Sequence, residues 1–148
     1  MLTKSVVGNI YDEKRQFKGN REWIELDWEE LNKRILRKKT DKGTDVAIAL
    51  ENSHPLKVGD IVFEDEHMQV VVRTKKEKVY VIYPDSMVQM GKMAFELGNR
   101  HTPCLISSDE IVVRHDETLE RLFKEVGVAF EQTERRFKQP FQYRGHKH

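Results

Sequence analysis

Histidine side chains are the groups of this chain whose positions suggest chemistry. His146 and His148 stand on either side of one lysine at the very end of the sequence, and His101 closes the segment of residues 95–101. A neutral imidazole nitrogen binds nickel, zinc or copper, and two imidazoles separated by one residue can turn toward the same ion. The pattern therefore indicates metal handling, although the spacing does not choose the metal.

His101 is expected just beyond the end of a helix that Gly98 stops, with its ring on a loop or at an element edge. A single imidazole holds a metal ion weakly, but a twofold dimer axis beside His101 would present two copies to one ion. Two imidazoles leave coordination positions open, and His146 or His148 could fill them. We therefore predict a metal site made of His101, His146 and His148.

Cys104 and His115 are two further candidate metal ligands near His101 in the sequence. Cys104 follows His101 at the spacing of a zinc half-site, but Pro103 and the Cys-Leu-Ile strand that begins there favour a buried, apolar cysteine. His115 stands beside Asp116, where a peripheral metal site is possible, yet helix capping and solvation explain the pair more simply. Both remain secondary candidates.

The remaining candidate ligands have simpler explanations. Met87, Met90 and Met93 could bind copper(I), but their helical spacing fits a core or a dimer face better. His54 and His67 have no clustered partner, so we assign them to surface loops.

The composition describes a soluble protein with a modest core and no dominant charge. Hydrophobic residues form 38% of the chain, and 26 Lys and Arg nearly balance 25 Asp and Glu, so no whole-molecule field attracts nucleic acid or an anionic membrane. The single cysteine, Cys104, excludes an intrachain disulfide and suits the cytosol. We find no signal peptide and no membrane span.

The length of 148 residues permits two small domains, and we predict an α+β chain with a boundary near the charged residues 74–78. Residues 1–75 read as a small all-β domain. Its strands are expected at residues 4–10, 23–28, 34–40, 45–50, 61–64 and 68–74, with turns at Gly43 and Gly59. The alternation from Trp23 to Trp28 predicts that Ile24 and Leu26 face the core.

Residues 76–140, which include the candidate ligand His101, are predicted to form a ferredoxin-like βαββαβ domain, and residues 141–148 a flexible tail. Strands are expected at residues 78–83, 104–107, 111–114 and 128–137. A first helix, capped by Asp85 or Ser86, carries its apolar stripe at residues 87, 90, 94 and 97. Asp116 caps a second helix that ends at Gly127.

Other functional classes find little support. The chain contains no P-loop, no nucleophile elbow, no His-Glu-x-x-His helix and no aromatic RNA-recognition signature, which argues against an enzyme. The basic run at residues 33–39 could contact RNA, but acidic residues 25–30 precede it and cancel much of its field.

The segment from Met90 to His101, the Gly59-Asp60 turn and the ending Gly-His-Lys-His resemble the UreE family of urease accessory nickel metallochaperones over essentially the whole chain. Leu-Gly-Asn-Arg-His is the most specific part. The resemblance implies that residues 1–75 bind a peptide or partner. It also implies a homodimer joined through the metal-binding second domains, with His101 of both subunits as the interface ligand and the tail histidines as supplementary ligands.

The function that the resemblance implies is a cytoplasmic carrier, not an enzyme, that delivers Ni(II) to urease during active-site assembly. Its partners would be the urease apoprotein complex and a GTPase accessory protein, with no nucleic acid and no membrane. Zn(II) or Cu(II) could occupy the same site, since copper generally binds imidazole most tightly. A zinc-stabilised structural dimer and an RNA-binding adaptor using residues 33–39 remain the alternatives.

Overall fold

The computed structural model describes residues 1–12, 14–52 and 54–141. Contacts divide them into two units, Met1–Lys75 together with Arg136–Gln139, and Lys76–Arg135 together with Pro140 and Phe141. No helix within the described ranges is long and apolar enough to cross a membrane. Each unit has a core of its own.

The first unit contains two small sheets. One has the order β1-β5-β4, from the strands β1 (Leu2–Thr3), β4 (Ile35–Lys39) and β5 (Asp45–Ala49). The other has the order β2-β6-β7-β3, from β2 (Gly8–Asn9), β3 (Asn20–Leu26), β6 (Asp60–Glu64) and β7 (Met68–Thr74). A short 3-10 helix, Glu30–Asn32, follows β3.

Strand β3 shows how the sequence sets the core of this unit. It pairs in parallel with β7, and its alternating residues Ile24 and Leu26 are fully buried, as the alternation predicts. Gly43 and Gly59 have positive φ angles of 88° and 91°, which confirms both predicted turns. The core is therefore built from residues far apart in the sequence.

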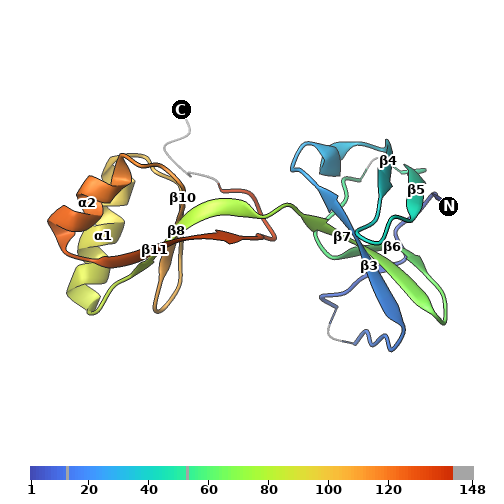
Figure 1. Cartoon of the computed structure of the whole chain (residues 1–148), viewed down its shortest axis with the longest axis horizontal. Helices are drawn as coiled ribbons and strands as arrows, with labels where there is room; N and C mark the ends of the chain where they lie inside the picture. The colour runs from blue at the N-terminus through green and yellow to red at the C-terminus, as the bar shows by residue number, and fades with distance from the viewer. Residues whose placement is uncertain (13, 53, 142–148) are drawn as a thin grey trace. The chain divides into compact units, whose positions relative to one another are not determined.

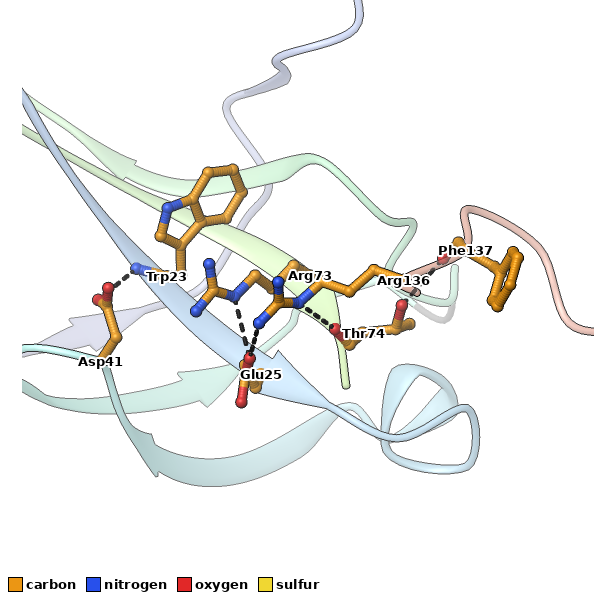
Figure 2. A network of polar contacts seen from close by, with 7 residues as sticks. All are labelled: Trp23, Glu25, Asp41, Arg73, Thr74, Arg136 and Phe137. Atoms are coloured by element: carbon orange, nitrogen blue, oxygen red, sulfur yellow. Dashed lines mark hydrogen bonds and ion pairs between the residues drawn. The ribbon is translucent and has the colours of Figure 1, made fainter. Parts of the chain in front are cut away.

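Residues 136–139 complete the first unit through polar contacts (Figure 2). Arg136 Nε donates to the carbonyl oxygen of Thr74 at 3.1 Å, and its terminal nitrogen binds the Glu25 carboxylate. The Thr74 hydroxyl donates to the carbonyl oxygen of Phe137 at 2.9 Å. Lys138 Nζ lies 3.6 Å from the centroid of the Tyr11 ring. Side chains near both ends of the sequence thus share one unit.

The second unit confirms the predicted βαββαβ arrangement. Its elements are β8 (Glu77–Tyr83), α1 (Met87–Asn99), β9 (Cys104–Ile106), β10 (Ile111–Arg114), α2 (Leu119–Val126) and β11 (Ala129–Arg135). The antiparallel sheet has the order β11-β8-β10-β9, and both helices lie on one side of it (Figure 1). The whole chain is thus α+β, as predicted.

Several local predictions differ from the structure. Residues 4–10 do not form one strand, because β1 ends at Thr3 and only the two residues of β2 pair within this range. The last strand covers Ala129–Arg135, not residues 128–137, since Arg136 and Phe137 turn to the contacts with Thr74 and Glu25.

The helix ends also need correction. Ser86 caps α1 by accepting the amide hydrogen of Gln89. The helix α2 begins at Leu119, and the side chain of the preceding Thr118 makes no capping bond. The Asp116 carboxylate accepts the amide and hydroxyl hydrogens of Thr118 and so caps the turn that leads into α2, as predicted. Met87 is 90% exposed and does not join the buried stripe. Gly98 lies inside α1 and does not stop it.

Candidate metal site

His101 lies at the C-terminal end of α1 in a left-handed backbone conformation, with φ of 56°. The amide of His101 donates to the carbonyl oxygen of Gly98 at 3.1 Å, and the amide of Thr102 donates to that of Leu97 at 3.0 Å. These two bonds form a Schellman motif, whose left-handed position is usually glycine. His101 therefore ends the helix, the role that the sequence assigned to Gly98.

The conformation of His101 carries an energetic cost. A non-glycine residue in the left-handed region loses about 1 kcal/mol to contact between its Cβ and the backbone. Residues held in such conformations cluster at functional sites. Because the side chain is also exposed, the helix end presents this imidazole to solvent at a fixed point of the backbone.

A pocket of about 420 Å³ brings His101 and His115 together. Asp116, Arg114 and the turn formed by Thr102 and Pro103 also contribute to its wall. Hydrogen bonds from Thr118 hold the pKa of Asp116 below its ordinary value, so this carboxylate is ionised at neutral pH. The two candidate positions that the sequence treats separately thus share one surface.

The ring of His115 packs against Tyr80 of β8. The two ring centroids are 5.0 Å apart, and the backbone amide of His115 donates to the carbonyl oxygen of Lys78 at 3.0 Å. The Tyr80 hydroxyl donates to Glu120 at 2.8 Å. Burial, reinforced by Glu120, raises the pKa of Tyr80 to about 12, so Tyr80 remains a neutral support for the His115 ring.

Cys104 packs against the core of the second unit at the start of β9. Burial raises the pKa of its thiol, which makes the metal-binding thiolate less accessible. These observations support the interpretation of Cys104 as a small apolar residue.

The outer side of α1 exposes a second apolar stripe. Val88 and Phe95 are 67% and 70% exposed, and they alternate with Gly91 and Gly98 at steps of three and four residues. Apart from adjacent residues and the backbone of the helix itself, no atom lies within 4 Å of where a Cβ would stand on either glycine. Since the inner side of α1 buries Met93 and Leu97, this helix is apolar on both sides.

The sequence analysis missed this second stripe, as well as the stacking of His115 on Tyr80. The residue types at positions 88, 91, 95 and 98 carry a readable signal, because they repeat at helical spacing one residue after the first stripe and therefore on a neighbouring side of the helix. The stacking depends on the register of β8 with β10, which no local pattern reveals.

The other predicted site residues, His146 and His148, lie outside the described residues. Within residues 1–12, 14–52 and 54–141, no group of three or more His, Cys, Asp or Glu side chains is arranged to hold one metal ion. His54 and His67 are exposed in the first unit. In the basic run, Arg37 pairs with Asp45 and Lys38 with Glu30, so much of its charge is neutralised locally.

The two units correspond to two described protein families. Residues 4–75 match the family model of the UreE urease accessory protein, N-terminal domain, and residues 77–148 match that of the UreE urease accessory protein, C-terminal domain. Together the matches cover nearly the whole chain in the order of the family. The chain therefore belongs to the UreE urease accessory proteins.

Individual relatives agree with this assignment. The chain is 59% identical over 148 residues to a urease accessory protein UreE of Lysinibacillus sphaericus, with all of both chains covered. It is also 59% identical to the UreE of Halalkalibacterium halodurans, covering all of this chain and 98% of the relative. The UreE of Bacillus sp. strain TB-90 is 37% identical over 149 residues, with 100% and 99% coverage.

Proposed function

We propose that this protein is a cytoplasmic nickel carrier that binds Ni(II) between two copies of the chain and delivers it to urease during assembly of the urease active site. The ion is cargo, and its transfer is ligand exchange without covalent catalysis. The observation that carries the proposal is the exposed imidazole of His101, held at the end of α1 in a conformation that costs the fold stability.

The proposed dimer uses the outer side of α1. Met87, Val88 and Phe95 are large, apolar and mostly exposed, and burying one such side chain is worth about 2 kcal/mol. Two copies of the three would contribute on the order of 10 kcal/mol, enough to offset much of the entropy lost on association. Gly91 and Gly98 leave room for close approach of a second helix.

A twofold axis beside the end of α1 would bring two His101 imidazoles to one ion. We propose that His146 and His148 complete the coordination, because two imidazoles satisfy neither a tetrahedral nor an octahedral site. Ligands on separate segments can leave one at a time. The urease apoprotein and its GTPase accessory protein could then take over the ion without its release into water.

The test combines nickel calorimetry with mass measurement of the intact complex. We expect one tight site per two chains. In His101→Ala that site should weaken by roughly a hundredfold or more, since even the loss of a group that only supports a metal ligand costs 10–100-fold. His67→Ala is the matched control, because it removes an exposed imidazole from the first unit and should leave nickel binding unchanged.

Two results would contradict the proposal. Unchanged nickel affinity in His101→Ala would remove His101 from the site. Dissociation of the dimer whenever the metal is removed would favour the alternative of a zinc-stabilised structural dimer, in which the ion serves only to join the subunits.

A further inference from the structure

Trp23 lies between two arginine side chains on the face of the sheet β2-β6-β7-β3 that is turned away from the core. Arg21 precedes it by two residues on β3, and its Cζ is 5.5 Å from the indole centroid. Arg73 of β7 stands opposite Glu25 in the parallel register, and its Cζ is 5.1 Å from the same centroid. Figure 2 shows the Arg73 guanidinium beside the indole.

Both guanidinium groups have N–H donors that make no hydrogen bond to another described residue. Arg21 Nε donates to Gln69 Oε1 at 2.7 Å, and Arg73 Nε lies 3.2 Å from Glu25 Oε1. Among the described residues, neither arginine uses a terminal guanidinium nitrogen in a hydrogen bond. A guanidinium that contacts an aromatic ring with its flat side leaves its N–H groups directed sideways, where a bidentate acceptor can bind.

The charges around Trp23 favour an acidic ligand. Arg136 and Arg73 share the single carboxylate of Glu25, and the hydrogen bond from Arg136 chiefly lowers the pKa of Glu25. Arg21 lies beside the same indole as Arg73, so three guanidinium groups and one Glu25 carboxylate belong to this surface. The Asp41 carboxylate accepts the backbone amide hydrogen of Trp23 at 2.9 Å. Even when its negative charge is included, the arginines outnumber the carboxylates around Trp23.

We propose that the surface formed by Arg21, Trp23 and Arg73, called here the Trp23 surface, binds an acidic segment of a partner protein. An Asp or Glu carboxylate of that segment accepts hydrogen bonds from the terminal nitrogens of Arg21 and Arg73. Its methylene groups contact the half-buried indole between them.

Two other occupants fit less well. Residues 136–148 of this chain contain no Asp or Glu side chain, so the chain's own C-terminal segment offers no acidic side chain. A nucleic-acid base needs an open aromatic ring for stacking, whereas guanidinium groups already lie over this indole. The Glu25 carboxylate would also repel a phosphodiester backbone.

The test measures fluorescence polarisation of a labelled pentaglutamate peptide with the full-length chain at low salt, in the presence of a chelator. We expect saturable binding that Arg21→Ala and Arg73→Ala each weaken by roughly tenfold, the usual effect of losing a charged hydrogen bond. The double variant should bind more weakly than either. Arg121→Ala is the matched control, since that arginine lies exposed on α2 of the second unit.

Thermal melting of each variant separates binding from folding, because Arg73→Ala also removes the contact with Glu25. Arg21→Lys keeps the charge without the planar donor pair and should still weaken binding. The proposal is overturned if pentaglutamate does not bind saturably, if Arg121→Ala weakens binding equally, or if a labelled single-stranded RNA binds the Trp23 surface more tightly. The chelator makes each outcome independent of the nickel proposal.

Discussion

The helices α1 and α2 cover the same side of one sheet, yet their outer sides differ in chemistry. On α1 the outer side presents Met87, Val88 and Phe95 to solvent. On α2 it presents charged side chains, including Arg121 and Glu125, whose atoms lie 3.2 Å apart in an ion pair between successive turns. The outer surface of α2 suits water, and that of α1 suits a protein partner.

The residues that end the two helices differ in backbone strain. Gly127 ends α2 with φ of 77°, a conformation that glycine adopts without strain. His101 occupies the left-handed position after α1, where an imidazole costs about 1 kcal/mol more than glycine. The comparison shows that α2 ends on a residue that adopts the left-handed conformation without strain, whereas α1 ends on a residue that is strained there.

Acidification should give the largest effect that this comparison predicts. An imidazole must be neutral to bind metal, and its ordinary pKa is about 6.5, so each imidazole ligand should cost roughly tenfold in nickel affinity between about pH 7.5 and pH 5.5. Two copies of His101 predict about a hundredfold loss, and additional tail histidines a steeper one. Calorimetry across this range measures it, and a flat profile would point instead to carboxylates or Cys104.

Placing a glutamate on the outer side of each helix tests the comparison between them. Phe95→Glu places a carboxylate in the proposed apolar interface and should weaken dimerisation by roughly a hundredfold or more, because an unpaired charge is costly to bury. Arg121→Glu changes the charge of α2 and should leave the dimer intact. Sedimentation equilibrium of the two metal-free variants measures their dimer dissociation constants. Equal constants would show that the outer sides of α1 and α2 contribute equally to the dimer.

Exchanging the residues at the helix ends sharpens the comparison further. His101→Gly should raise the free energy of unfolding of the metal-free protein by about 1 kcal/mol while removing the tight nickel site. Gly127→His should lower the free energy of unfolding by a similar amount and leave nickel binding unchanged. Urea titration supplies the stabilities, and a loss of stability in His101→Gly would show that the imidazole itself supports the fold.

Deletion of residues 145–148 should have the smallest effect on the protein. We expect weaker nickel binding with a shallower pH dependence, since His146 and His148 are lost. The thermal midpoint of the metal-free form should not change, because a Gly-His-Lys-His segment offers little apolar surface. A lower midpoint would assign these residues a structural role.

The sequence predicted those features that depend on local periodicity. The strand at Met68–Thr74 and the helix beginning at Met87 follow directly from alternation and helical spacing. The stop at Gly98 was wrong because glycine in a helix is common enough to mislead, while the hydrogen bonds of Thr102 and His101 place the left-handed residue three positions later. Helix-end geometry depends on backbone bonds that residue type only suggests.

Features that depend on pairing between distant segments were not predicted. Trp23 could be placed on the outer face of its strand, but its contact with Arg73 follows from the parallel register of β3 with β7. The shared pocket of His101 and His115 likewise depends on the packing of α1 and α2 on the sheet. Site residues were therefore identified one by one, and their grouping required the structure.

The contacts of Arg136 have a consequence for synthesis on the ribosome. Glu25 and Thr74 emerge early, but the arginine that binds both is the 136th residue of 148. Since a chain is made from its N-terminus, the contacts of Arg136 with Glu25 and Thr74 can form only after every helix and strand of the second unit has been translated. Until then Glu25 has Arg73 as its ion-pair partner on β7, and the last strand and both helices are already available to fold.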